Sequence, residues 1–173
     1  MSVASHRRTA PGRVRCFVLT VSDTRTLATE TSGRTIASLL EAAGHHVTGR
    51  QVVRDDPAEV TRVLREELDR ADARVLITTG GTGISARDST YEAAIALFEK
   101  ELVGFGELFR MLSFADIGSA AMLSRATAGI AGRSAIFVLP GSEAAVRLAM
   151  TRLILPELGH VVGEVDKHMT GQK

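Results

Sequence analysis

The order of apolar and polar positions predicts short strands that alternate with helices along most of the chain. Residues 14–21 and 75–79 are rich in apolar and β-branched side chains, as are strands covered on both faces of a parallel sheet. Residues 47–53 and 134–139 are further strand candidates, and segments with the spacing of amphipathic helices separate these runs. This alternation predicts an α/β fold: a three-layer αβα sandwich with a mostly parallel central sheet.

A turn-like pair, Gly132-Arg133, modifies this picture near the end of the chain. It lies between residues 127–131 and 134–139, so the sequence predicts a short antiparallel edge hairpin. Further on, residues 153–162 have a helical pattern that contains Pro156. Because proline has no amide proton, we expect a kink or a fresh helix start there.

The helix expected at residues 107–114 has apolar side chains over most of its circumference. We expect the glycine-containing segment 102–106 to separate it from helical residues 91–98. Two interpretations remain open: the helix lies deep in the core, or it also packs on a neighbouring subunit. The second interpretation predicts a homo-oligomer.

Length and composition predict one domain. The chain has 173 residues, of which 45% are hydrophobic, which is enough for a single full core. We expect a domain at 13–163, a disordered N-terminal tail at 1–12 and a polar C-terminal tail at 164–173. The formal net charge is +1 and there is no long basic run, so we expect no nucleic-acid partner.

The single cysteine, Cys16, excludes the disulfide framework of a small secreted protein and favours a cytoplasmic location. No apolar run is long enough to span a bilayer, so we expect no membrane partner. Two adjacent histidines, His45 and His46, suggest a metal at first sight. Neighbouring strand residues point to opposite faces, however, and we expect surface histidines instead.

A glycine-rich loop after residues 75–79 is the strongest candidate for chemistry. Gly80, Gly81, Thr82 and Gly83 let backbone N–H groups approach an anion closely. The loop lacks the Lys-Ser or Lys-Thr pair of a P-loop and the GxGxxG spacing of a dinucleotide fold. It continues into Arg87 and Asp88, and then into Ser89 and Glu92, which have the spacing of a capping box. We therefore expect a phosphate-binding loop of another type.

Polar residues also follow the other expected strands. Asp56 and Pro57 form a helix start, which leaves Asp55 without a capping role at the end of a strand. Ser22 and Asp23 follow the first strand. A simpler interpretation of these two is that they are turn residues, and a simpler interpretation of Asp55 is that it is a solvated loop carboxylate. Because carboxyl ends of parallel strands meet at one edge, we expect these residues, the glycine loop and residues 140–142 to share one rim.

Several separate motifs together resemble one known family. They are Val21-Ser22-Asp23-Thr24, Thr78-Thr79-Gly80-Gly81-Thr82-Gly83 with Arg87-Asp88 and Thr90, Gly104-Phe105-Gly106-Glu107, Met122-Leu123-Ser124-Arg125 and Leu139-Pro140-Gly141-Ser142. In this order and spacing, they are similar to the molybdenum cofactor biosynthesis proteins of the MoaB and Mog type, over residues 13–162. The chain departs from many relatives at Ile84-Ser85-Ala86, where aromatic or proline residues are more usual.

The resemblance implies a protein that binds molybdopterin, a pterin dithiolene with a terminal phosphate. Adenylyltransferases of this family join it to AMP from Mg-ATP and release pyrophosphate, and they are trimers or hexamers. A molybdenum insertase is a possible recipient of the product, and tungsten chemistry is an open alternative. A molybdopterin-binding carrier or scaffold without transferase activity, and a nucleotide hydrolase of the competence-damage type, are the other functions that we considered.

The resemblance also implies roles for individual residues. Asp55 and Asp88 match acidic active-site residues and would hold Mg²⁺, a hard ion that prefers oxygen ligands. For Arg87 and Asp88, a mutual surface ion pair is the alternative. The positions that match the substrate pocket are Ser22, Asp23, Gly80, Gly81, Thr82, Gly83, Ser124, Pro140, Gly141 and Ser142.

Overall fold

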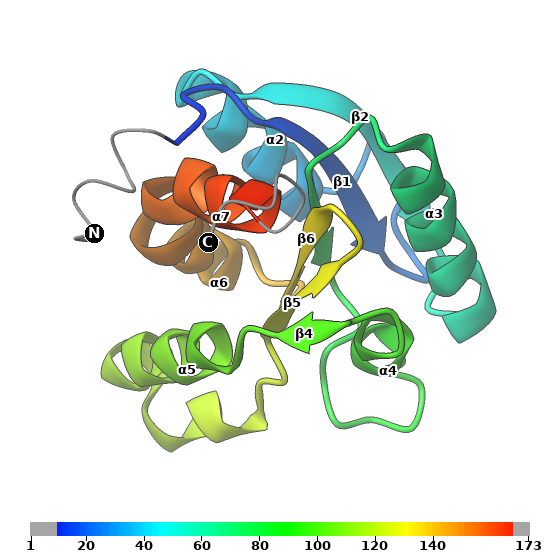
Figure 1. Cartoon of the computed structure of the whole chain (residues 1–173). Helices are drawn as coiled ribbons and strands as arrows, with labels where there is room; N and C mark the ends of the chain where they lie inside the picture. The colour runs from blue at the N-terminus through cyan, green and yellow to red at the C-terminus, as the bar shows by residue number, and fades with distance from the viewer. Residues whose placement is uncertain (1–9, 168–173) are drawn as a thin grey trace.

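A mixed sheet forms the middle layer of the protein (Figure 1). The computed structural model describes residues 10–167, and in this part of the chain six strands lie in the order β2-β1-β3-β6-β5-β4. The neighbours among β2, β1, β3 and β6 are parallel, whereas β5 and β4 are antiparallel additions at one edge. The strands are β1 (Arg15–Val21), β2 (His46–Val53), β3 (Val75–Thr79), β4 (Lys100–Glu101), β5 (Thr127–Ala131) and β6 (Ser134–Leu139). The predicted α/β sandwich with an antiparallel hairpin is confirmed.

Helices cover both faces of this sheet (Figure 1). One face packs on α2 (Ser32–Ala42), α5 (Val103–Ile117), α6 (Glu143–Ala149) and α7 (Leu155–Lys167). The other face packs on α3 (Pro57–Arg70) and α4 (Thr90–Ile95). The strand β1 supplies both layers, because successive side chains point to opposite faces: Cys16 and Val18 lie in one core, Phe17 and Leu19 in the other.

The lone cysteine is part of the first core. Cys16 is a free thiol with no exposed surface. Its burial raises the pKa of the thiol to about 12, because the apolar surroundings disfavour the thiolate.

The helix α5 differs from its prediction. It begins at Val103 and runs through Gly104 and Gly106, so these glycines do not interrupt a helix as expected. A Cβ atom at Gly106 would lie 2.7 Å from the carbonyl oxygen of Ala126, so glycine here allows the helix to approach its neighbour closely. The short strand β4, which was not predicted, separates α5 from α4. The helix α4 ends at Ile95.

The last helical region is longer than expected. The α-helix α6 passes through a π-helical turn, η2 (Met150–Ile154), into α7, where Pro156 is the second residue. Pro156 thus restarts the α-helix directly after the irregular turn. Because α7 continues to Lys167, residues 164–167 belong to a helix and not to the polar tail that we predicted; residues 1–9 and 168–173 lie outside the described residues.

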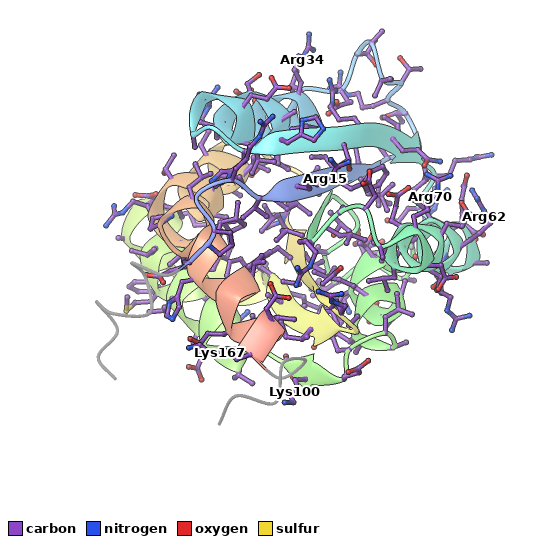
Figure 2. The ribbon with its side chains drawn as sticks, turned by 45° about the horizontal axis from the view of Figure 1, so that its top comes forward. Arg15, Arg34, Arg62, Arg70, Lys100 and Lys167 are labelled. Atoms are coloured by element: carbon purple, nitrogen blue, oxygen red, sulfur yellow. The ribbon has the colours of Figure 1, made fainter. Side chains whose placement is uncertain are left out.

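Basic side chains are distributed over several elements. Figure 2 labels Arg15 on β1, Arg34 on α2, Arg62 and Arg70 on α3, Lys100 on β4 and Lys167 on α7. Four of them pair with a nearby carboxylate: Arg15 with Asp72, Arg62 with Glu66, Arg70 with Glu67 and Lys167 with Glu164. At these four positions the positive charge is neutralised locally. Among the helices within residues 10–167, none has the length and apolar character needed to cross a membrane.

Candidate functional site

Four segments meet at the carboxyl ends of neighbouring strands. Residues 22–23 follow β1, Asp55 follows β2, residues 80–88 follow β3, and residues 140–142 follow β6. Since the strand order is β2-β1-β3-β6, these segments line one edge of the sheet. The shared edge that the sequence predicted is therefore confirmed, and we call these four segments the rim.

The first glycine of the loop is in close contact with β1. Gly80 has a φ of 101° and donates its N–H to the carbonyl oxygen of Leu139 at 3.1 Å. A Cβ atom on Gly80 would lie 2.1 Å from the carbonyl oxygen of Val21, and one on Gly141 would lie 3.4 Å from the Cα atom of Gly80. Glycine at position 80 thus permits three rim segments to meet without a side chain between them.

The second glycine lies over two polar side chains. Gly81 has a φ of 64°, and a Cβ atom there would be 2.1 Å from Thr90 Oγ1 and 2.7 Å from Asp55 Oδ2. Thr90 Oγ1 is buried and has no hydrogen-bond partner among the described residues. Within residues 10–167, the N–H groups of Gly81, Thr82 and Gly83 have no protein acceptor. Three consecutive backbone donors are therefore available to an anion at this loop.

Asp55 is held in place by residues on both sides. Its Oδ1 accepts hydrogen bonds from Ser89 N at 3.2 Å and from Ser89 Oγ at 2.8 Å, and its own N–H donates to Asp23 Oδ1 at 3.2 Å. The predicted capping box is therefore wrong: Ser89 is the N-cap residue of α4, but its side chain bonds to Asp55 and not to the helix. In the described chain, Asp55 Oδ2 receives no protein hydrogen bond.

Asp88 lies beside the third glycine of the loop. A Cβ atom at Gly83 would be 2.7 Å from Asp88 Oδ2, which accepts the N–H of Ser85 at 2.9 Å. Asp55 and Asp88 therefore both face the glycine loop. The alternative of an Arg87–Asp88 ion pair is wrong, because Arg87 pairs with Asp23 at 3.3 Å while its side chain stays 80% exposed.

The serines of the rim are engaged in local structure. Ser22 Oγ accepts the N–H groups of Thr24 and Arg25, as its interpretation as a turn residue requires. Ser142 Oγ accepts Ala145 N–H at 3.3 Å as the N-cap of α6. Each hydroxyl still has its proton to donate. The Pro140 carbonyl oxygen accepts the hydroxyl of Thr79 at 2.9 Å, which fixes this loop against the end of β3.

Ser124 lies outside the rim. Its neighbour Arg125 contacts the rim, and Arg125 was not identified as a site residue from the sequence. The Arg125 guanidinium donates to the carbonyl oxygens of Thr82 at 3.4 Å and Asp88 at 3.1 Å, so it holds both ends of the glycine loop. It also pairs with Glu92 and lies 4.9 Å from the ring centroid of Tyr91. These partners are 33 to 43 residues away in sequence, and only the resemblance motif that contains Arg125 could have indicated it.

We expect Arg125→Lys to lower the free energy of unfolding by about 1–2 kcal/mol, because one ammonium group cannot reproduce the planar set of contacts. The hydrogen bond from Arg125 is the main cause that lowers the pKa of Glu92 below its ordinary 4.5. A lowered carboxylate pKa stabilises the fold above the unfolded value and is lost as the pH falls through the folded one. The difference between the two proteins should therefore be complete at pH 7 and shrink below pH 4.5.

Urea unfolding at pH 7 and at successively lower pH measures this effect. The matched control is Arg147→Lys, which affects an exposed pair with Glu143 on a single helix and should lower the free energy of unfolding much less than Arg125→Lys does. Equal losses in the two variants would show that Arg125 does not hold the loop.

A hollow of about 300 Å³ lies outside the rim, between α5 and residues 122–127. The polar side chains in its lining carry both signs of charge and include an aromatic ring: Tyr91, Glu101, Arg110, Ser124, Arg125 and Thr127. A second hollow, of about 340 Å³, is mainly apolar and lies away from the rim, between β4, β5 and α7. Arg125 links the first hollow to the glycine loop, because it lines that hollow and donates to the carbonyl oxygens of Thr82 and Asp88.

The adjacent histidines His45 and His46 are both partly buried. The Nδ1 atom of His45 accepts the N–H of Val14 at 3.2 Å. Burial lowers the pKa of His45, which favours the neutral ring. Across residues 10–167, no three His, Cys, Asp or Glu side chains are grouped so that they could hold a metal ion.

Comparisons with known proteins agree with the fold and the motifs. Residues 17–160 match the family described as "probable molybdopterin binding domain". Two similar proteins are the molybdenum cofactor biosynthesis proteins B of Halalkalibacterium halodurans, 54% identical over 96% of this chain and 99% of that one, and of Bacillus subtilis, 54% identical over the same shares.

Solved structures give the same result. The crystal structure of a molybdenum cofactor biosynthesis protein B has a TM-score of 0.88 and 52% identity, covering 92% of this chain and 99% of that one. The tungsten cofactor synthesizing protein MoaB from Pyrococcus furiosus has a TM-score of 0.82 and 38% identity, over 90% and 99%. The chain belongs to the molybdopterin-binding domain family, as a molybdenum cofactor biosynthesis protein of the MoaB and MogA type.

Proposed function

We propose that this protein is a molybdopterin adenylyltransferase. In the proposed reaction, an oxygen of the terminal phosphate of molybdopterin attacks the α-phosphorus of ATP, and the bond from that phosphorus to pyrophosphate breaks. The observation that carries the proposal is the convergence of two carboxylates, Asp55 and Asp88, on a glycine loop with three available N–H donors. Transfer between phosphates needs positioning and charge stabilisation more than a protein nucleophile.

The residues present fit a magnesium ion. Asp55 Oδ2 and Asp88 Oδ1 accept no protein hydrogen bond in the described chain, and the space beside Asp55 is the space that a side chain at Gly81 would fill. Mg²⁺ is usually bound by one or two carboxylates together with waters and substrate phosphates. When bound, the ion would neutralise charge on the phosphates. Asp55 and Asp88 would hold it through their unpaired oxygens.

The other rim residues bind and orient the substrates in this proposal. The N–H groups of Gly81, Thr82 and Gly83 would donate to a phosphate, and Arg125 would keep the loop in that conformation. The hollow lined by Tyr91, Arg110 and Ser124 is linked to the loop through Arg125, and its polar groups would contact the pterin. Closely spaced donors in a fixed backbone need little rearrangement when charge develops.

Direct assay of the purified protein tests the proposal. With molybdopterin and Mg-ATP, we expect adenylated pterin and an equal amount of pyrophosphate. The alternative is a molybdopterin-binding carrier without transferase activity. One observation favours this alternative: the described residues hold no group of three metal-ligating side chains, so any ion would depend on substrate for its remaining ligands. Tight pterin binding without product would decide for the carrier.

We also propose that the protein forms a homo-oligomer, a trimer or a hexamer, through α5 and the following 3₁₀ helix η1 (Gly118–Leu123). The buried residues of α5 are only Gly106, Phe109 and Ser113. The helix therefore does not lie deep in the core, so the first of the two interpretations of this helix is wrong. A row of apolar side chains on α5 and η1 is exposed: Val103, Leu108, Met111, Phe114, Ile117, Met122 and Leu123. Exposed apolar side chains gathered on two consecutive helices are typical of an interface.

We expect Phe114→Glu to reduce the solution mass to that of a monomer, because it places a charge in the middle of this surface. Sedimentation equilibrium of wild type and variant measures the change. The control is Leu27→Glu, which alters a similarly exposed apolar side chain outside α5 and should leave the mass unchanged. A monomeric wild type would refute the proposed assembly.

A further inference from the structure

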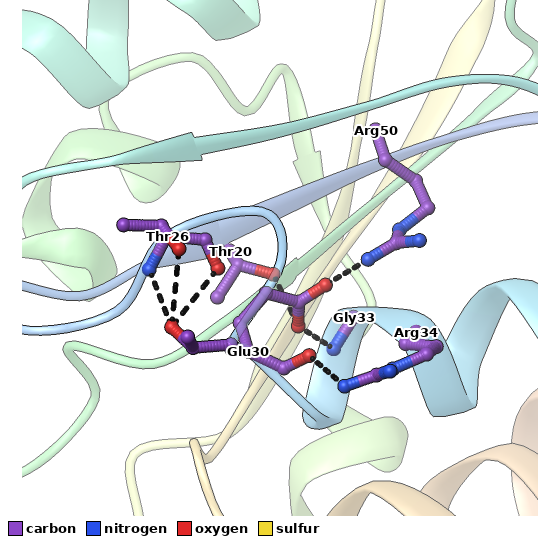
Figure 3. A network of polar contacts seen from close by, with 7 residues as sticks. Thr20, Thr26, Glu30, Gly33, Arg34 and Arg50 are labelled. Atoms are coloured by element: carbon purple, nitrogen blue, oxygen red, sulfur yellow. Dashed lines mark hydrogen bonds and ion pairs between the residues drawn. The ribbon is translucent and has the colours of Figure 1, made fainter.

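One buried carboxylate outside the rim connects four segments of the protein. Glu30 is 2% exposed and follows the loop that begins with Ser22 and Asp23. Its Oε2 accepts the N–H of Gly33 at 2.7 Å and the hydroxyl of Thr20 at 3.3 Å. Its Oε1 pairs with Arg50 of β2 (Figure 3). A single side chain thus joins β1, β2, the loop and the start of α2.

Glu30 also satisfies the amino end of α2. The N-cap residue, Thr31, makes no side-chain bond to the helix, so the carboxylate of Glu30 takes over this role at the N–H of Gly33. The negative charge is favourable there because helix amino ends are partly positive. A Cβ atom at Gly33 would lie 2.3 Å from Thr20 Oγ1 and 2.9 Å from Glu30 Oε2, so the contact leaves no room for a side chain.

The anchored helix start supports a second rim segment. Ser32 Oγ donates to the carbonyl oxygen of Gly141 at 2.6 Å, and Thr35 Oγ1 donates to Glu143 at 3.2 Å. The first contact holds the loop after β6 where Gly141 approaches Gly80. The position of this loop therefore depends on where α2 begins.

The loop on the other side of Glu30 supports Asp55. Residues 23–29 are exposed, and the segment is fixed at one end by the bond from Ser22 N–H to Val53 and at the other by Glu30. Within it, Asp23 accepts the N–H of Asp55 and pairs with Arg87. Release of the Glu30 end would leave Asp23 free to move away from Asp55.

We propose that Glu30 is a positioning residue for the rim: its buried carboxylate fixes the loop that holds Asp23 against Asp55 and the helix start that holds Gly141. The effect on turnover rests on the proposed adenylyl transfer, whereas the anchoring of the loop does not. Because Glu30 is buried outside the rim, its loss should lower turnover more than pterin affinity.

Two measurements on Glu30→Gln test this inference, below the onset of unfolding. Limited digestion with trypsin reports the loop, because Arg25 lies within it; cleavage after Arg65 of α3 serves as the internal reference for global unfolding. We expect cleavage after Arg25 to rise at least tenfold relative to cleavage after Arg65. In the transfer assay, we expect kcat to fall at least tenfold and the molybdopterin Kd to change less than threefold.

The matched control is Glu67→Gln. Glu67 is also buried, at 5% exposure, and also pairs with an arginine, Arg70, but it lies on α3 away from the rim. We expect neither the Arg25 cleavage ratio nor kcat to change in this variant. If Glu30→Gln does not fold, Thr20→Val removes one of the same hydrogen bonds at nearly constant volume and should shift both readouts in the same direction.

The outcomes separate the two claims. An unchanged Arg25 cleavage ratio overturns the inference, and so does faster cleavage with unchanged kcat. If wild type yields no product, the proposed transferase fails, and the cleavage ratio of Glu30→Gln against Glu67→Gln still decides whether Glu30 anchors the loop.

Discussion

Asp55→Asn is expected to lower kcat for adenylyl transfer by about 10²–10³-fold while molybdopterin affinity changes less than about threefold. Asparagine keeps an oxygen that can accept the two hydrogen bonds from Ser89, so the local fold should persist. It replaces Oδ2, the oxygen that faces Gly81, by an amide and removes the negative charge. Steady-state assay of product and equilibrium binding of molybdopterin measure the two quantities separately.

The neighbouring residue provides the control for this substitution. Asp56 caps α3 by accepting the N–H groups of Ala58 and Glu59, both at 2.9 Å, and asparagine is an equally good N-cap residue. Asp56→Asn should therefore retain both stability and turnover. A loss of pterin binding with unchanged kcat in Asp55→Asn would contradict the role proposed for Asp55.

Gly80→Ala is expected to reduce the free energy of unfolding by about 3 kcal/mol or more. The added Cβ atom would lie 2.1 Å from the carbonyl oxygen of Val21, a backbone atom that cannot rotate away, and would sit on a residue with a φ of 101°. Relief of the overlap requires the end of β1 to move, so molybdopterin binding should weaken as well. Urea unfolding measures the first effect.

Gly44→Ala separates backbone strain from overlap. Gly44 has a similar φ of 86°, but no atom of residues 10–167 lies within 4 Å of a Cβ atom there. This control should lose only the conformational part, about 1–2 kcal/mol. If both variants lost the same free energy, close contact between the glycine loop and β1 would not matter for stability.

The shared rim could be predicted from the sequence because it depends only on the topology of the sheet. Once the strands before Asp23, Asp55 and Gly80 are assigned to one parallel sheet, their carboxyl ends must meet at one edge. No distance is needed for that inference. The assignment of the strands depended only on apolar runs and β-branched residues, which are strong signals in buried strands.

The errors arose where a distant partner outweighs a local signal. Ser89 has capping-box spacing, yet its hydroxyl bonds to Asp55, 34 residues away. Gly106 looks like a helix breaker, yet it lies within α5, where its lack of a side chain lets the helix approach Ala126 closely. The roles of Arg125 and Glu30 are likewise defined by contacts across the fold, which no window of sequence contains.

The buried thiol described above has a practical consequence for work on the rim. Cys16 is the only cysteine of the chain, it has no exposed surface, and its pKa of about 12 leaves almost no thiolate at neutral pH. It should neither form mixed disulfides with a dithiolene ligand nor react with maleimides. A cysteine introduced at Ile84, which is 70% exposed beside the glycine loop, would thus carry a fluorescent or spin label at one defined position without replacement of Cys16.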